Sequence, residues 1–314
     1  MKRLIPTYRR KRPGHRVPKL VAASAVMVLA FAGCAALGTA GSATSGSAGL
    51  AANVPALVVD EAAAQLLPDS IKSAKVLKVA IPTNEPPTQY YRDGTQDMTG
   101  VNPDVARLIG QALGVDVEIH VANFDSIIPG MAADRYDMTV SSMTPTTQRM
   151  QVLDFVDYMQ VGNVLAVAKG NPLGLDEHSL CGRKVGFLIA SYQLSTLVPE
   201  YDADCTAAGK DQIQTSEFQD SRQAISALTS GRLDAVLADS PILDFAVTQS
   251  PDIEIASRYD FTPVGIGVPK DSKLVESVSV ALSDVLRSAS YVQVLENYGL
   301  ESSAITDARV NFAQ

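Results

Sequence analysis

The stretch Ser141–Met150, "SSMTPTTQRM", places five hydroxyl side chains and one arginine in a short span. It continues the alternating run "YDMTV", which is typical of a strand. A guanidinium group is a rigid fork of N–H donors that pairs with a carboxylate through two hydrogen bonds and keeps its charge. Arg149 and the neighbouring hydroxyls are therefore suited to form half of a binding site for a small anion. The alternative is a polar loop with a solvated arginine.

Few residues in this chain offer catalytic or metal chemistry. Beyond the basic N-terminal region there are two histidines, His120 and His178, and neither has a second ligand at a metal-binding spacing. The sequence also lacks a phosphate-binding loop, a dinucleotide fingerprint and a nucleophile elbow. We therefore expect binding rather than turnover, with no cofactor and no metal.

Strands and helices alternate around Arg149, which predicts an α/β fold with mainly parallel sheets. "VLKVAI" and "VDVEIHV" are typical of strands, and "VNPDVARLIGQALG" of a helix capped by Asn102. The pattern then recurs, because "SEFQDSRQAISALTSGRLDAVLAD" is similar to "ANFDSIIPGMAADRYDMTVSS". Two such units predict two lobes. Since ligands bind beyond the carboxyl ends of such strands, we expect Ser141, Ser142 and Asp239 around one cleft. Asp239 has an ordinary alternative role as the cap of the helix that begins "SPILDFAV".

Basic charge is concentrated at the N-terminus. Residues 1–33 hold eight of the 26 basic residues and no acidic ones, which leaves 18 basic against 34 acidic residues, a net charge of −16. The rest of the chain is therefore too acidic to bind the negatively charged phosphate backbone, which excludes a nucleic-acid partner. The basic region leads into an apolar run that ends in small residues, so residues 1–33 are predicted to be a signal peptide. A retained transmembrane anchor is the alternative.

The three cysteines fit an extracytoplasmic protein. Gly33-Cys34 resembles a bacterial lipobox, in which Cys34 becomes the lipidated first residue of the mature chain. We expect residues 34–74 to be this cysteine and a flexible tether that holds the protein at the outer face of the cell membrane. Cys181 and Cys205 are then an even pair in an oxidising compartment, which predicts a disulfide. Two buried thiols are the alternative.

From about Val76 to Leu300 the chain resembles the family 3, amino-acid-type, periplasmic solute-binding proteins of ABC importers. Four stretches carry the resemblance, in this order: "GVNPDVARLIGQALG", "FDSIIPGMAADRYDMTVSSMTPTTQRMQVLDFVDYM", "KVGFLIASYQ" and "GRLDAVLAD". Their joint order and spacing make the resemblance specific.

The resemblance implies roles for individual side chains. Arg149 matches the arginine that clamps the α-carboxylate of the ligand, and Asp239 matches the acid that pairs with its α-ammonium group. Two further pairs match supporting positions: Ser142 and Thr144 as acceptors for the ammonium group, and Ser191 and Tyr192 as donors that complete the carboxylate site from the second lobe. An ordinary helix cap is the alternative for Ser191.

The chain departs from the family pattern at the side-chain end of the cleft. Where the family has an aromatic residue near the first strand, this sequence has Glu85, and the family's "PPF" is Pro86-Pro87-Thr88. Phe124 keeps an apolar wall position. A carboxylate in place of a ring favours a ligand with a further cation or a polar amide. The alternative is that Glu85 points to solvent.

The resemblance also implies a two-lobed, periplasmic-binding-protein-like (type II) fold with the ligand in the interlobe cleft. We expect lobe 1 to comprise residues 75–163 and 261–314, and lobe 2 residues 164–260. Such a protein is a monomer that captures a polar or cationic amino acid by lobe closure and delivers it to a membrane ABC permease with its ATPase. The alternatives are a dehydratase- or lyase-like enzyme on the same fold, with Glu85 as its acid, and a ligand-sensing subunit of a receptor.

Overall fold

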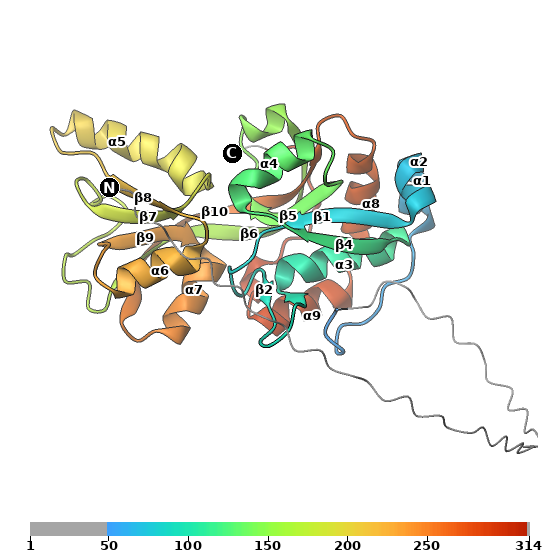
Figure 1. Cartoon of the computed structure of the whole chain (residues 1–314), viewed down its shortest axis with the longest axis horizontal. Helices are drawn as coiled ribbons and strands as arrows, with labels where there is room; N and C mark the ends of the chain where they lie inside the picture. The colour runs from blue at the N-terminus through green and yellow to red at the C-terminus, as the bar shows by residue number, and fades with distance from the viewer. Residues whose placement is uncertain (1–48, 313–314) are drawn as a thin grey trace, which may run out of the picture. The chain divides into compact units, whose positions relative to one another are not determined.

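A computed structural model describes residues 49–312 (Figure 1). The predicted signal peptide, residues 1–33, and the predicted lipidation site, Cys34, lie outside the described residues. Between residues 49 and 312 no helix combines the length and the apolar character that a membrane crossing requires.

The described chain is organised around an eight-stranded sheet with the order β4-β1-β5-β10-β6-β9-β7-β8 (Figure 1). Its strands are β1 (Val76–Ile81), β4 (Asp116–Val121), β5 (Met138–Met143), β6 (Leu153–Ala168), β7 (Lys184–Leu188), β8 (Gln214–Phe218), β9 (Ala235–Asp239) and β10 (Ile253–Pro269). A separate two-stranded sheet pairs β2 (Tyr90–Tyr91) with β3 (Met98–Thr99).

Each half of the large sheet is parallel, and two long antiparallel strands join the halves. β1 lies between β4 and β5 in one half, and β7 lies between β8 and β9 in the other. β6 and β10 pair with each other along their length and run through both halves. The predicted α/β class, with two similar units, is thus confirmed. The length of these two strands was not predicted from the sequence.

Lobe 1 has helices on both faces of its half of the sheet. One face carries a large apolar core under α1 (Glu61–Leu66), α2 (Asp69–Ala74), α3 (Val101–Leu113), α8 (Leu274–Leu286) and α9 (Ala289–Tyr298). The other face is covered by α4 (Phe124–Ala132), which buries Ile127 and Met131 against the sheet. The short turn η3 (Glu301–Ser303) follows α9.

The prediction of a tether up to residue 74 is wrong for its last part. Val54, Ala63, Leu67 and Ile71 are buried in the core of lobe 1. Ala63 lies in α1, Ile71 lies in α2, and Leu67 is the residue that ends α1. This segment is therefore part of the folded core of lobe 1 and is not a free tether that leads to it.

Lobe 2 is built in the same way around β7 and β9. One face packs on α6 (Ser221–Thr229) and α7 (Ser240–Gln249), and the other on the π-helical turn η2 (Gln193–Leu197) and α5 (Val198–Ala207). Asp220 caps α6 by accepting a hydrogen bond from the Gln223 N–H (3.0 Å). The carboxyl ends of the parallel strands in both lobes face the segment where β6 and β10 pass from one half to the other.

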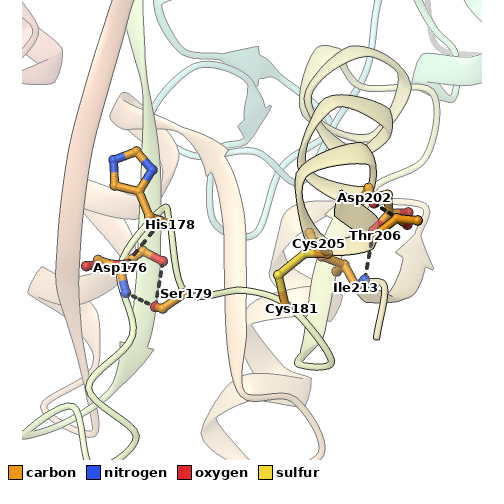
Figure 2. The surroundings of a disulfide bond; sticks show 8 residues. All are labelled: Asp176, His178, Ser179, Cys181, Asp202, Cys205, Thr206 and Ile213. Carbon is orange, nitrogen blue, oxygen red and sulfur yellow. Dashed lines mark hydrogen bonds between the residues drawn. A yellow bond between two sulfur atoms is a disulfide. The ribbon is translucent and has the colours of Figure 1, made fainter. Parts of the chain in front are cut away.

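A disulfide between Cys181 and Cys205 joins the loop before β7 to α5 (Figure 2). Close to it, the Asp202 carboxylate accepts a hydrogen bond from the Ile213 N–H (2.8 Å), which holds the segment that follows α5. The bond closes a loop with a sequence separation of 24 residues within lobe 2.

Removing this disulfide should destabilise the protein. In the chain-entropy description, a loop of this size contributes about 3 kcal/mol to the free energy of unfolding. We expect the Cys181→Ser/Cys205→Ser double variant to lose about that amount in urea unfolding, measured against the oxidised parent. Two reactive thiols in the parent, or an unchanged midpoint in the variant, would contradict a stabilising bond.

Candidate functional site

A pocket lies where strand ends of the two lobes meet. Lobe 1 contributes the end of β5 and the short turn η1 (Arg149–Gln151), and lobe 2 contributes the ends of β7 and β9 and the start of α6. The lining residues are Ser142, Thr144, Arg149, Leu188, Ser191, Tyr192, Gln193, Ser221, Ala238, Asp239 and Ile242.

Arg149 lies in the wall of this pocket as a buried cation. It is 8 % exposed, and its guanidinium donates to the Thr144 carbonyl (Nη1, 2.8 Å) and to the Ala190 carbonyl of lobe 2 (Nη2, 2.8 Å). Phe124, the first residue of α4, lies beneath it, with the guanidinium carbon 5.6 Å from the ring centre. Burial lowers the pKa of Arg149 to about 10, and the negative charge of Asp239 opposes that shift. Since a guanidinium has five N–H donors, three are left for another partner.

Asp239 faces the same pocket from lobe 2. It ends β9 and occupies the capping position just before α7, but its side chain makes no capping hydrogen bond, so the ordinary alternative of a helix cap does not hold. The Oδ1 atom accepts from Gln193 Nε2 (2.7 Å), which also donates to Asn163 Oδ1 (2.9 Å). Burial raises the pKa of Asp239 to about 6, against the opposing effects of Gln193 and Arg149. Within residues 49–312 this carboxylate has no ion-pair partner, and most of its acceptor capacity is unused.

Ser142 is held by a closed hydrogen-bond network. Its backbone has a left-handed φ of 52°, its N–H donates to the Tyr158 hydroxyl (3.0 Å), and its hydroxyl accepts from Asn102 Nδ2 (3.1 Å). The Tyr158 hydroxyl in turn donates to Asn102 Oδ1 (2.6 Å), and burial raises the pKa of Tyr158. The network fixes the position at which β5 ends.

The prediction that Asn102 caps its helix is wrong. α3 begins at Val101 with Gly100 as the capping residue, and Asn102 lies wholly buried within the first turn. Its amide is used for Ser142 and Tyr158 instead of the helix N-terminus. A polar residue near a helix start fits both uses, so the sequence pattern alone did not distinguish them.

Ser191 and Tyr192 lie in the pocket wall after β7. The Ser191 hydroxyl accepts from the Leu194 N–H (3.2 Å), so the ordinary role as a cap is present. The Ser191 N–H donates to the Leu188 carbonyl (3.1 Å) and is not turned to the pocket. Tyr192 is half-buried against the apolar core under α5.

Three of the residues singled out in the sequence do not line the pocket. The Ser141 hydroxyl is buried on the other side of β5 and accepts from the Thr139 hydroxyl (3.0 Å). Alternate residues of a strand point to opposite faces, which separates Ser141 from Ser142. Phe124 reaches the pocket only through Arg149.

Glu85, the third of these residues, does not point to solvent. It is 2 % exposed, and its Oε1 atom accepts from the Ser221 N–H at the start of α6 in lobe 2 (2.6 Å). Next to it, the Asn84 amide donates to Asp220 Oδ2 (3.3 Å), so two consecutive residues of lobe 1 contact two of lobe 2. Burial raises the pKa of Glu85 to about 8, against the hydrogen bond from Ser221.

Gln193 and Ser221 also line the pocket, and neither was predicted from the sequence. Gln193 comes directly after the predicted pair Ser191 and Tyr192, and it buries its amide between Asp239 and Asn163. Ser221 follows the capping Asp220, and that motif was available in the sequence. What the motif could not show is that this helix start faces lobe 1.

Comparisons with known proteins give a consistent result. A family model described as bacterial extracellular solute-binding proteins, family 3, matches residues 77–301. The chain is 25 % identical over 248 residues to the arginine-binding protein ArgT of Corynebacterium glutamicum, an alignment covering 78 % of this chain and 81 % of ArgT.

Solved structures of binding proteins are also similar. An ancestral arginine-binding protein bound to arginine has a TM-score of 0.65 and 28 % identity, covering 71 % of this chain and 98 % of that one. An ancestral arginine-binding protein bound to glutamine has a TM-score of 0.63 and 30 % identity, covering 72 % and 99 %.

Proposed function

Because the chain belongs to family 3 of the bacterial extracellular solute-binding proteins, we propose that its interlobe pocket captures one free α-amino acid. The membership confirms the resemblance predicted from the sequence. The observation that carries the proposal is the pairing of Arg149 and Asp239, since a buried cation and a buried acid from opposite lobes line one pocket. An α-amino acid carries the complementary carboxylate and ammonium groups on one carbon atom.

Each charged group has unused capacity for such a ligand. Arg149 uses two of its five N–H donors within the protein, so three are left for a ligand. The planar guanidinium group suits a carboxylate. Asp239 accepts one hydrogen bond from Gln193 and has room for the α-ammonium group. Ser142 and Thr144 are proposed to add acceptors to this group, and Ser191 and Tyr192 to bound the carboxylate from lobe 2.

Contacts from both lobes couple binding to closure. A ligand shifts an open–closed equilibrium only through its higher affinity for one state, and a ligand bridging Arg149 and Asp239 has that property for the closed state. We place the hinge in β6 and β10. β6 begins to pair with β9 at Asn163, and the β6–β10 register shifts between Tyr259 and Thr262.

The ligand proposed is an amino acid with a polar or cationic side chain. The similar proteins named above carry arginine or glutamine in their names and titles. Among the described residues that line the pocket, Arg149 is balanced by Asp239, and the carboxyl groups of Glu85 and Asp220 lie close behind the wall, which favours a ligand with additional positive charge.

Location and partners follow the family. We propose that lipidated Cys34 anchors the protein at the outer face of the cell membrane and that the monomer delivers its ligand to an ABC permease with its ATPase. The enzyme alternative predicts that the ligand is chemically changed, and the sensor alternative predicts a receptor in place of a permease.

A ligand screen tests the proposal. The full chain is mixed with each of the 20 standard amino acids, and the melting temperature is measured. We expect stabilisation by one or a few of them, since a ligand at 100 times its Kd adds about 2.7 kcal/mol to the stability of the folded state. Mass spectrometry of the recovered ligand should show it unchanged. A transformed ligand would support the enzyme, and no shift with any amino acid would contradict the proposal.

A further inference from the structure

We propose that Glu85 selects the ligand by the charge of its side chain, and that it selects a cationic one. This inference rests on the proposed function, because it assigns the side-chain end of the same amino-acid pocket.

Glu85 lies directly behind the pocket wall. Ser221 lines the pocket, and its N–H donates to Glu85 Oε1 over 2.6 Å. The carboxyl group is thus one hydrogen bond beyond the lining, at the end of the pocket formed by the first turn of α6. The hydrogen bonds of Arg149 and Asp239 lie elsewhere in the pocket. Arg149 donates to the Thr144 and Ala190 carbonyls, and Asp239 accepts from Gln193.

The carboxyl group of Glu85 is only half satisfied. Its Oε2 atom is buried and has no hydrogen-bond partner among residues 49–312, although the residue is only 2 % exposed. The Ser221 hydroxyl beside it is also buried and forms no hydrogen bond of regular geometry, although it lies close enough to Glu85 to lower the pKa of that carboxyl group. Leaving a buried acceptor unpaired is unfavourable, and more so for a charged one. A buried carboxylate oxygen without a hydrogen-bond partner at this end of the pocket therefore indicates a donor that arrives with the ligand.

The charges around the pocket specify the kind of donor. The ammonium and carboxylate groups of an amino acid would neutralise Asp239 and Arg149 respectively. Asp220 already accepts hydrogen bonds from Asn84 and Gln223. Among the described residues Glu85 has neither a counter-charge nor a donor for its Oε2 atom, and a guanidinium or ammonium group on the ligand side chain supplies both.

The shifted pKa of Glu85 agrees with a buried carboxyl group that meets a cationic ligand side chain. Burial raises its pKa to about 8, and the nearby charges of Asp220 and Asp239 act in the same direction. A neutral side chain leaves Glu85 to take up a proton, whereas a cationic side chain stabilises the carboxylate. The site should therefore distinguish two ligands of equal shape and different charge.

L-arginine and L-citrulline are such a pair. We expect the full chain to bind arginine about 10- to 100-fold more tightly than citrulline in calorimetric titration, since hydrogen bonds to a charged partner carry that difference. In Glu85→Gln, which keeps an acceptor for the Ser221 N–H, the ratio should fall to about threefold or less, through loss of arginine affinity. Glu217→Gln, an exposed change on β8, is the matched control and should leave the ratio as in the parent.

The outcomes separate this inference from the proposed function. A ratio near one in the parent chain, or an unchanged ratio in Glu85→Gln, overturns the selection by Glu85 while amino-acid binding stands. If Glu85→Gln fails to fold, the ratio of arginine to citrulline affinity in the parent chain still tests selection by charge. A parent chain that binds no amino acid at all overturns both.

Discussion

Replacing Arg149 with alanine should weaken amino-acid binding by about 3–5 kcal/mol, because it removes one partner of a buried ion pair and leaves the ligand carboxylate without a counter-charge. Calorimetric titration of the purified chain measures the change. The loss should be confined to ligands with an α-carboxylate. For the variant, L-arginine and its decarboxylated analogue agmatine should therefore bind about equally weakly.

Two further variants separate charge from geometry at this position. Arg149→Lys keeps the positive charge without the planar fork, and its affinity should lie between those of the parent and the alanine variant. Arg287→Ala removes an exposed arginine that pairs with Asp284, and an exposed pair of this kind contributes little. A less than tenfold loss of affinity in Arg149→Ala would refute the assignment of Arg149 to the carboxylate.

The second large effect is expected at Asp239. Asp239→Asn retains the shape of the side chain and an oxygen that accepts from Gln193, but removes the charge opposite the α-ammonium group. Truncating one member of a buried, hydrogen-bonded charge pair weakens binding by about 2–5 kcal/mol. The measurement is again titration with the preferred amino acid.

The matched control for Asp239 is Asp252→Asn, an exposed change in the turn before β10. It should leave the affinity unaltered. An Asp239→Asn chain that binds as tightly as the parent would show that the ammonium group lies elsewhere, while leaving the role of Arg149 open to its own test.

Much of the site could be predicted from the sequence because strand ends define it. The two repeated α/β units place the ends of β5 and β9 at corresponding positions, and the polar residues there, Ser142 and Asp239, line one pocket. Arg149 follows the end of β5, and its assignment to the ligand carboxylate came from the resemblance to the family, not from the strand pattern. The placement of Ser142 and Asp239 needs only the strand period and the rule that ligands bind at the carboxyl ends.

The residues that were missed depend on tertiary contacts between segments far apart in the chain. Asn102 bonds Ser142 and Tyr158, and Glu85 bonds Ser221, across separations that no local pattern encodes. The length of β6 and β10 was missed for a related reason. A strand that crosses two lobes changes its environment midway, so its apolar pattern does not repeat regularly.

The preference of the chain between L-arginine and agmatine tests most directly whether an amino acid is held through its α-carboxylate. Both ligands present the same guanidinium group, and only arginine has a carboxylate for Arg149. Calorimetric titration should show one-to-one binding of arginine and at least about 100-fold weaker binding of agmatine, as the loss of one partner of a buried ion pair implies. Equal affinities for the two would contradict capture of an amino acid between Arg149 and Asp239.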